Sequence, residues 1–337
     1  MMQNDLITII IPVYNGADYI GDCVEGIKSQ TYTNYEVFFI NDGSVDGSDK
    51  ILTEYCQNNP NFFLINIKNC GAGLARNYGI DHARGKYICF IDVDDKIAPH
   101  YLQKLHDLIT TLSADVACAE YIKNKKTDFE VLSDEIKILT GQQAVDDLLS
   151  MKIKNGPTVK IYAREAIGNM RMPNYCVAED LFFNYWVFKN AQRVIVNDSI
   201  LYSYTVGNNS LSTREFSPQR MDSIEAVNKI NENEHSFYSI LRLFMEAYFI
   251  IEKIILAKGE DKFSQEYRIA KETLTLYRET VVNDKRTPAR QKLVARLLKF
   301  GPKFTVNIMT MKQKAQKLSF DDIIKGDEKT GESDEDS

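Results

Sequence analysis

Three carboxylates stand within four residues, directly after an apolar, strand-like run. Asp92, Asp94 and Asp95 follow the segment Tyr87–Ile91, whose side chains are apolar or aromatic. Carboxylates this close repel one another unless water or a cation neutralises them. A hard divalent ion with oxygen ligands does this and can grip a diphosphate at the same time. The alternative is an acidic loop that caps the helix beginning at Pro99.

A second polar cluster closes another apolar run. Residues 41–48 read Asn-Asp-Gly-Ser-Val-Asp-Gly-Ser and follow Val37–Ile40. An aspartate at the end of a strand, here Asp42, can accept hydrogen bonds from a nucleotide base and a ribose hydroxyl, and the glycines permit close approach. The same residues are equally suited to a plain turn with a helix cap, so both interpretations stay open.

A glycine-containing segment, residues 71–79, opens a helix after a third apolar run. Glycines before a helix resemble a phosphate cradle, although the spacing is not that of a dinucleotide fingerprint. Arg76 and Asn77 could reach a diphosphate or orient the acidic loop. The alternative is that both are solvated helix residues.

A carboxylate pair, Glu179-Asp180, opens an apolar helix farther along the chain. Acidic side chains are favoured at a helix N-terminus, and this explains the pair by itself. An aspartate at the edge of a pocket can also act as a general base that takes a proton from an attacking hydroxyl.

The segments that must position these residues alternate between apolar runs typical of strands and the hydrophobic periodicity typical of helices. Four apolar runs predict strands, at residues 6–11, 37–40, 62–67 and 87–91, and the first two are expected to be buried. Helical periodicity lies between them. Strand–helix alternation with short connections predicts an α/β fold with a doubly wound, mostly parallel sheet covered by helices on both faces. Ligands gather at the carboxyl ends of the strands in such sheets, which is where the polar motifs lie.

Together, these motifs resemble family 2 of the inverting glycosyltransferases, which has the Rossmann-like GT-A fold. Residues 9–15 are similar to the family's first strand, residues 41–48 to its DDGSxDGS motif, and residues 73–79 to its A-R-N-x-G helix. Residues 92–95 resemble its DxDD motif, and Glu179-Asp180 its downstream ED pair. The likeness covers about residues 5–215. Asn41 departs from it, because the family usually has Asp there.

The resemblance implies a metal-dependent hexosyltransferase that moves a sugar, with inversion, from a nucleotide-sugar donor to an acceptor hydroxyl. The donor would be UDP-linked, and the acceptor a glycan or lipid-linked saccharide of bacterial cell-envelope polysaccharide synthesis. Carried over residue by residue, the donor-binding positions are Pro12, Tyr14, Asn15, Asp42 and Asp92, and the interpretation of residues 71–79 above adds Arg76 and Asn77. Asp94 and Asp95 would lie nearest Mg²⁺ or Mn²⁺. Asp180 would be the general base, with Glu179 beside it.

Three alternatives stand beside this interpretation. A polyprenyl-phosphate sugar transferase would use the same fold with a phosphate oxygen as acceptor. A non-catalytic nucleotide-sugar-binding subunit is a different class, and the intact acidic motifs count against it. A dinucleotide oxidoreductase is disfavoured, because Pro12-Val13-Tyr14-Asn15 stands where a glycine fingerprint would follow the first strand.

The charge of the chain is unevenly distributed. Its 337 residues hold 41 Lys and Arg against 47 Asp and Glu, a formal net charge of −6 that argues against nucleic acid as a partner. Residues 285–320 carry ten bases and no acid, interleaved with apolar side chains, whereas residues 321–337 carry eight acids and two bases. A basic amphipathic helix indicates either contact with an anionic membrane surface or a helix packed on the catalytic domain.

These patterns predict three regions. Residues 1–215 form the GT-A domain, with a nucleotide-sugar half at 1–105 and an acceptor half at 106–215. Residues 216–320 form a helical C-terminal region, and residues 321–337 an acidic disordered tail. The sequence has no apolar run of membrane-spanning length and no recognisable secretory signal, so we expect a cytoplasmic protein that is peripheral at the inner face of the cell membrane.

Overall fold

The computed structural model describes residues 5–124, 129–206 and 215–312. The chain divides into two compact units. The first comprises residues through Arg214 together with Glu225–Glu234, and the second comprises Glu215–Ile224 and the chain from His235 onward. The expected division at residue 105, between donor and acceptor halves, remains a prediction, as does the domain boundary at 215. The expected acidic tail lies outside the described residues.

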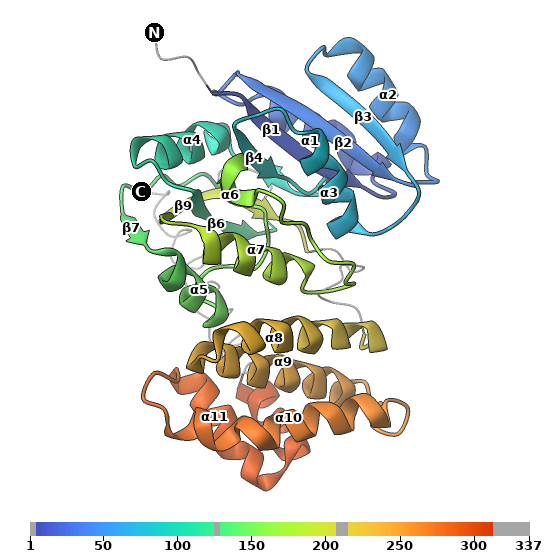
Figure 1. Cartoon of the computed structure of the whole chain (residues 1–337). Helices are drawn as coiled ribbons and strands as arrows, with labels where there is room; N and C mark the ends of the chain where they lie inside the picture. The colour runs from blue at the N-terminus through green and yellow to red at the C-terminus, as the bar shows by residue number, and fades with distance from the viewer. Residues whose placement is uncertain (1–4, 125–128, 207–214, 313–337) are drawn as a thin grey trace, which may run out of the picture. The chain divides into compact units, whose positions relative to one another are not determined.

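The first unit is built on a mixed sheet to which nine strands of the described residues contribute (Figure 1). Its strands are β1 (Ile7–Val13), β2 (Tyr35–Asp42), β3 (Phe62–Ile67), β4 (Tyr87–Phe90), β5 (Lys96–Ile97), β6 (Val116–Lys123), β7 (Ile136–Leu139), β8 (Lys160–Ala163) and β9 (Val194–Tyr204). Their order across the sheet is β3-β2-β1-β4-β8-β6-β9-β5, and β7 pairs with β9.

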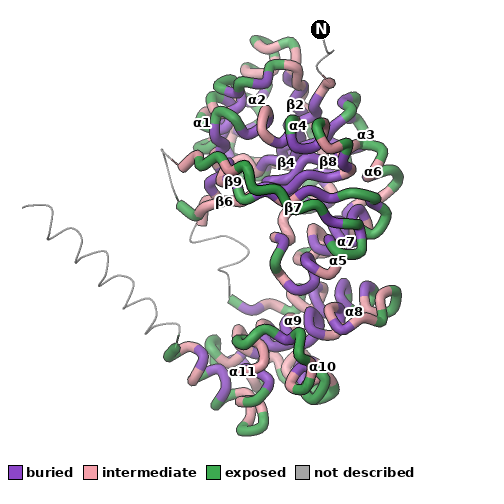
Figure 2. The backbone as a smooth tube through the Cα atoms, turned by 90° about the vertical axis from the view of Figure 1, so that its left-hand side faces the viewer, coloured by how far each residue is buried: buried purple, intermediate pink, exposed green. Residues whose placement is uncertain are grey.

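Strands β3, β2, β1 and β4 run parallel to one another, and β6 runs parallel to β9. Strand β8 pairs antiparallel with β4 and β6, and β5 and β7 pair antiparallel with β9. The predicted α/β class with a mostly parallel sheet is confirmed. Figure 2 shows the difference in burial between a strand that the sequence predicted and one that it did not: β4 is buried along its length, while β7 is largely exposed. The two-residue β5 and the exposed β7 were not predicted, because neither forms a buried apolar run.

Helices cover both faces of this sheet. They are α1 (Ala17–Lys28), α2 (Ser48–Asn58), α3 (Ala72–His82), α4 (Tyr101–Thr111), α5 (Gly141–Leu149), α6 (Arg164–Ile167) and α7 (Glu179–Asn190), followed by α8 (Asp222–Glu234), which belongs mainly to this unit. Alternate residues of β1 face opposite sides. Ile9 joins the core formed with α1 and α4, whereas Ile10 faces α3, where a Cβ on Gly79 would lie 2.3 Å from it.

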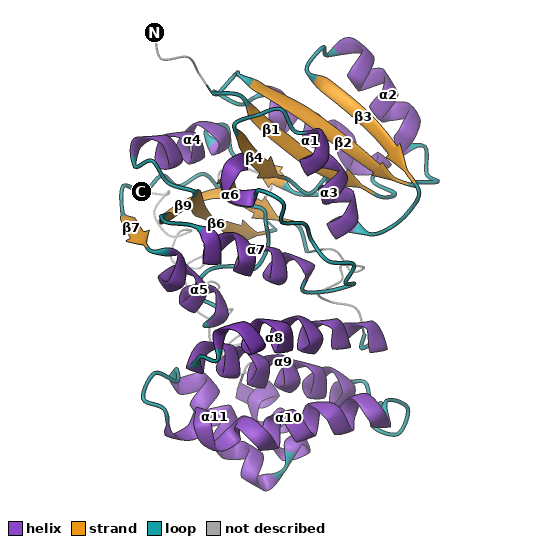
Figure 3. Ribbon diagram, viewed as in Figure 1, coloured by secondary structure: helices purple, strands orange, loops and turns teal. Residues whose placement is uncertain are grey.

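The second unit consists of helices and loops in its described part (Figure 3). Its elements are η1 (Pro218–Met221), α9 (Phe237–Leu256), α10 (Ser264–Asn283), α11 (Ala289–Leu297) and η2 (Leu298–Phe300), and residues 302–312 are also helical. This confirms the predicted helical C-terminal region. None of the helices in the described ranges is both long and apolar enough to cross a bilayer.

Candidate active site

The loops that follow β1 and β2 hold each other at the carboxyl edge of the sheet. The Asn15 N–H donates to Ser44 Oγ at 3.0 Å, and the Val45 N–H donates to Asn15 Oδ1 at 2.9 Å. Asn15 has φ +50°, in the left-handed region that asparagine tolerates better than most residues. The predicted donor residue Asn15 thus helps to build its own turn. Beside it the ring of Tyr14 is 56% exposed, and Pro12 lies within β1.

Asp46 and Ser48 fix the start of α1. The Ala17 N–H donates to Asp46 Oδ2 at 2.9 Å, and the Gly16 N–H donates to Ser48 Oγ at 3.1 Å. Desolvation acts to raise the pKa of Asp46, but hydrogen bonds from Ser48 and Ala17 outweigh it and leave that pKa below its ordinary value. The helix-capping interpretation of residues 41–48 therefore applies, although the helix whose free N–H groups are satisfied is α1.

The carboxylate of Asp42 is turned toward the loop between β3 and α3. Its two oxygens accept the N–H groups of Cys70 at 2.7 Å and Gly71 at 2.9 Å, and its backbone carbonyl accepts from Asn69 Nδ2 at 2.9 Å. Asp42 is buried. These bonds fix the N-terminus of α3, a role that the sequence did not indicate. Its expected contact with a nucleotide base stays a prediction.

Arg76 lies buried at the point where three of the sequence motifs meet. Its Nη2 lies 2.6 Å from Asp92 Oδ1, and its Nη1 lies 3.7 Å from Glu179 Oε1. The guanidinium belongs to α3, Asp92 follows β4, and Glu179 begins α7. Burial acts to lower the pKa of Arg76, but the carboxylates of Asp92 and Glu179 raise it above the ordinary value, so the side chain stays charged. The alternative of a solvated helix residue is wrong for Arg76.

Glu179 packs against α3 at the start of α7. A Cβ added to Gly73 would lie 2.8 Å from Glu179 Cγ, so only glycine leaves room for this side chain. The residue before it, Ala178, has φ +66°, a conformation that L-residues with a Cβ rarely adopt. Burial raises the pKa of Glu179 to about 7, the adjacent Asp180 adds to the shift, and Arg76 opposes it. Asp180 is half-buried, and its Oδ1 accepts the N–H of Leu181 at 2.6 Å.

Asn77 holds the segment that leads to this carboxylate pair. Its Nδ2 donates to the Met172 carbonyl at 2.8 Å, and its Oδ1 accepts the Met172 N–H at 2.8 Å. Both ends of the amide thus anchor backbone 95 positions away in the sequence. The half-buried side chain therefore has a structural role in holding this segment. Its expected donor contact remains a prediction.

The acidic turn after β4 is tied to the end of β9. The Asp92 N–H donates to Tyr202 Oη at 3.1 Å, and the Thr205 N–H donates to Asp95 Oδ1 at 2.7 Å. Burial raises the pKa of Asp95 to about 8, with Asp92 as the next cause. Burial and Asp92 also raise the pKa of Asp94. The clustered carboxylates therefore suffer the mutual repulsion that their spacing predicts.

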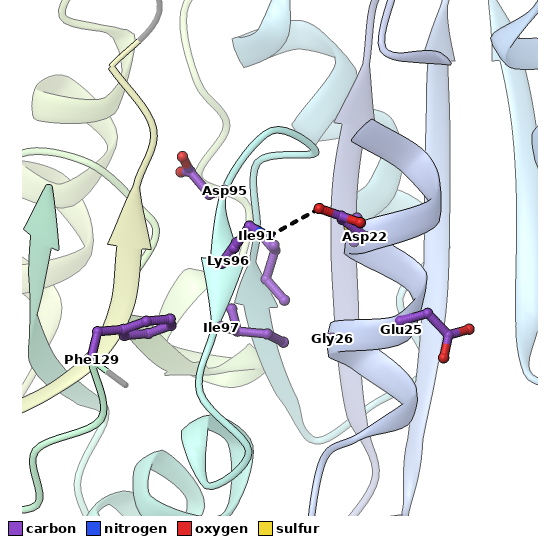
Figure 4. A pocket seen from close by; sticks show the side chains of 9 residues that line it. Asp22, Glu25, Gly26, Ile91, Asp95, Lys96, Ile97 and Phe129 are labelled. Carbon is purple, nitrogen blue, oxygen red and sulfur yellow. Dashed lines mark hydrogen bonds and ion pairs between the residues drawn. The ribbon is translucent and has the colours of Figure 1, made fainter. Parts of the chain in front are cut away.

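Asp95 also lines a cavity of about 250 Å³ beside α1 (Figure 4). The Lys96 ammonium and the Asp22 carboxylate lie 2.9 Å apart at this cavity, and apolar side chains including Ile91 and Ile97 form part of its wall. Asp95 Oδ2 is buried and has no hydrogen-bond partner among the described residues. An ionised buried oxygen without a partner is costly, so this site fits a cation that would supply the missing interaction.

The carboxylates do not form a complete metal cage by themselves. Within the described ranges, no three or more His, Cys, Asp or Glu side chains converge as a metal site. Any cation held at Asp94 and Asp95 therefore needs further ligands, such as water or the oxygens of a bound diphosphate.

A buried lysine that sequence reasoning missed anchors the loop before β8. Lys160 Nζ donates to the carbonyls of Lys154 at 2.9 Å and Gly156 at 2.5 Å. In the same loop, the Asn155 carbonyl accepts a hydrogen bond from Asn184 Nδ2 of α7 at 2.5 Å. Desolvation lowers the pKa of Lys160. The only sequence signal was a lysine inside an otherwise apolar strand.

Comparison with known proteins places these features in a family context. Residues 8–167 match the family model for glycosyl transferase family 2. Glycosyltransferase GlyA of Streptococcus pneumoniae is 30% identical over 223 residues, which are 63% of this chain and 32% of GlyA. The uncharacterized glycosyltransferase YibD of Escherichia coli is 30% identical over 222 residues, 63% of this chain and 64% of YibD. The chain thus spans about a third of the first relative and slightly less than two thirds of the second.

The fold extends the likeness beyond the matched domain. The crystal structure of residues 1–349 of S. aureus TarS in complex with UDP-GlcNAc superimposes with a TM-score of 0.61 and 18% identity. The alignment covers 92% of this chain and 91% of that one. At this identity the likeness concerns the fold alone, and it confirms the expected GT-A architecture followed by a helical region.

Proposed function

Because residues 8–167 match the family model for glycosyl transferase family 2, we propose that the chain transfers a sugar from a nucleotide-sugar donor to an acceptor hydroxyl with inversion of configuration. One observation carries the proposal: Arg76 binds Asp92 and Glu179 together, so the acidic turn of the donor half and the carboxylate pair share one place at the sheet edge. A donor site and a general base must be adjacent for such a transfer.

We propose a UDP-linked donor. Asp42 ends β2, and Tyr14 and Asn15 directly follow β1. All three lie at the carboxyl ends of these strands, the place where parallel α/β sheets bind nucleotides. TarS, which has a similar fold, was solved with UDP-GlcNAc, and this favours the same nucleotide here. For the acceptor we propose a hydroxyl of a glycan or lipid-linked glycan of bacterial polysaccharide synthesis, as in the family resemblance.

We propose that Asp94 and Asp95 hold Mg²⁺ or Mn²⁺. The support is the unpartnered Asp95 Oδ2 and the raised pKa values of both carboxyls, each of which a cation would relieve. When bound, the cation would neutralise charge on the departing nucleoside diphosphate. Asp92, already held by Arg76, would contact the donor on the other side of the turn.

Asp180 is the proposed base. It takes the proton of the acceptor hydroxyl, whose oxygen attacks the anomeric carbon while the bond from that carbon to the diphosphate oxygen breaks on the opposite face. The raised pKa of Glu179, caused first by burial, reduces the negative charge beside Asp180 near neutrality. Asp180, half-buried and at the start of α7, is then the carboxylate placed to receive a proton.

The test is a panel of nucleotide sugars incubated with the purified chain and Mn²⁺ or Mg²⁺, with release of nucleoside diphosphate as the readout. We expect UDP release from at least one UDP-sugar, dependent on the metal. Donor binding without any release, with or without added acceptors, would instead indicate a non-catalytic nucleotide-sugar-binding subunit.

A further inference from the structure

The apolar side of α11 is used for packing inside the helical unit. Val294 and Ala295 are buried, and Leu293 and Leu297 are half-buried. The sequence offered two interpretations of this basic helix, a membrane contact or packing on the catalytic domain. The structure packs α11 against α10 of its own unit, so this side of the helix is not the free surface.

An exposed apolar stripe follows immediately after α11 in the described part of the chain. Phe300, Phe304 and Met311 are 62%, 45% and 67% exposed, and the rings of Phe300 and Phe304 lie 5.4 Å apart. On the helix of residues 302–312, positions 304, 308 and 311 share one side by their spacing of four and three. Thr305, Val306 and Met309 occupy the other side and are buried. The helix thus packs by one side and presents a second apolar side outward.

Basic side chains flank this stripe. Lys303 and Lys312 lie on its two sides by helical position, and both are exposed. Lys299 Nζ lies 4.8 Å from the centre of the Phe300 ring. Glu260, before α10, pairs with Lys303 at 2.8 Å, and Asp261 also acts electrostatically on that lysine. Residues 285–320 themselves carry ten bases and no acid.

We propose that Phe300, Phe304, Ile308 and Met311, with Lys299, Lys303 and Lys312, form a surface that docks on an anionic lipid bilayer. Apolar and aromatic side chains enter the headgroup boundary, and the lysines beside them are attracted to anionic lipid. The lysines complement the negative charge of an anionic bilayer. They favour a bilayer over a partner protein, because lysine is depleted at the cores of protein interfaces. The inference stands independently of the proposed transferase activity.

The experiment is co-sedimentation of the full chain with phosphatidylcholine vesicles, with and without phosphatidylglycerol, in the absence of any donor. We expect binding only to the vesicles that contain phosphatidylglycerol, and we expect salt to weaken it. The double variant Phe300→Ser and Phe304→Ser should bind at least about tenfold more weakly. Lys299→Glu should lower binding at least about fivefold.

Leu276→Ser is the matched control, because Leu276 is 69% exposed on α10 of the same unit and lies one helical turn from Glu272 and Glu279. It should bind vesicles like the wild type, and all variants should keep the wild-type melting temperature. Undiminished binding of the double variant, equal binding to neutral vesicles, or no binding by the wild type would overturn the proposal. If the wild type did not bind vesicles but a chain lacking residues 321–337 did, the proposal would be overturned for the full chain, and the acidic tail would be the occupant of this surface. If light scattering showed that the wild type is a dimer and the double variant a monomer, the occupant of this surface would be a second copy of the chain, and the proposal would be overturned.

Discussion

The Arg76 guanidinium lies 2.6 Å from the Asp92 carboxylate, and both come from segments that the sequence separates by 16 positions. The same guanidinium approaches Glu179, at the start of α7. One buried cation thus balances two carboxylates that would otherwise be desolvated without a partner. This arrangement links the stability of the fold to the chemistry proposed for the site.

Replacement of Arg76 by Met should therefore destabilise the chain. Removing one partner of a buried ion pair typically costs about 3–5 kcal/mol, because the remaining charge stays buried and unpaired. Urea unfolding measures this free energy. The control is Arg171→Met, which breaks a more exposed pair with Asp81 and should cost less than about 1 kcal/mol. Equal losses in the two variants would contradict the role given to Arg76.

Gly73→Ala should disturb the site without unfolding the protein. The added Cβ would lie 2.8 Å from Glu179 Cγ and must push that side chain away from Arg76. We expect transfer to fall roughly 10- to 100-fold, as small misplacements in active sites do. Gly21→Ala is the matched control, since Gly21 also lies in a helix but a Cβ there meets only Tyr55 Oη at 3.8 Å. Wild-type transfer by Gly73→Ala would exclude the predicted displacement.

The stability of the ligand-free protein should fall as the pH rises from about 4.5 to about 7 because of Glu179. Burial is the main reason that the pKa of Glu179 is raised from 4.5 to about 7. Below that window the carboxyl is protonated in both the folded and the unfolded chain. Within it the unfolded chain loses the proton first, so the folded state is progressively penalised, and above about pH 7 the full penalty applies.

Glu179→Gln removes this titration. The difference in unfolding free energy between the variant and the wild type, measured across that pH range, should change in favour of the variant as the pH rises. A difference that is constant with pH would show that Glu179 does not titrate in this window.

Asp94→Ala should weaken donor binding only when a metal is present. The proposed cation would be held by this carboxylate, so its loss should reduce affinity at least about tenfold in Mn²⁺. Calorimetric titration with a UDP-sugar, with Mn²⁺ and with a chelator, measures both conditions. Glu165→Gln, an exposed acid on α6, serves as the control. Identical affinity of Asp94→Ala and the wild type in Mn²⁺ would remove Asp94 from the metal site.

The sequence predicted β1, β2 and β4 well because each is an almost continuous buried run, and it found the half-buried β3 from its apolar residues alone. It also predicted that acidic motifs would lie at strand ends. It could not predict how Asp42 and Asn77 use their side chains. The Asp42 carboxylate accepts hydrogen bonds from backbone N–H groups 28 and 29 positions away, and the Asn77 amide forms hydrogen bonds with the backbone of Met172. Such partners are set by tertiary packing, which no local pattern encodes. The hydrogen bonds of Lys160 to the loop before β8 are of the same kind.

The sequence pattern also could not predict which apolar side chains of the basic segment are exposed. Leu293 and Leu297 share the amphipathic spacing of Phe304 and Met311, and hydrophobic periodicity alone cannot tell a side that packs from a side that faces outward. The exposed fractions of Phe300 and Met311 distinguish them.

The central claim is that Asp180 is the base of a sugar transfer from a nucleotide donor. The most direct measurement compares wild-type chain and Asp180→Asn for steady-state transfer and, in parallel, for UDP-sugar affinity by calorimetry. The account predicts that the variant loses about 10²- to 10⁴-fold in kcat and binds the donor within about threefold of the wild type. Wild-type turnover in Asp180→Asn would contradict it.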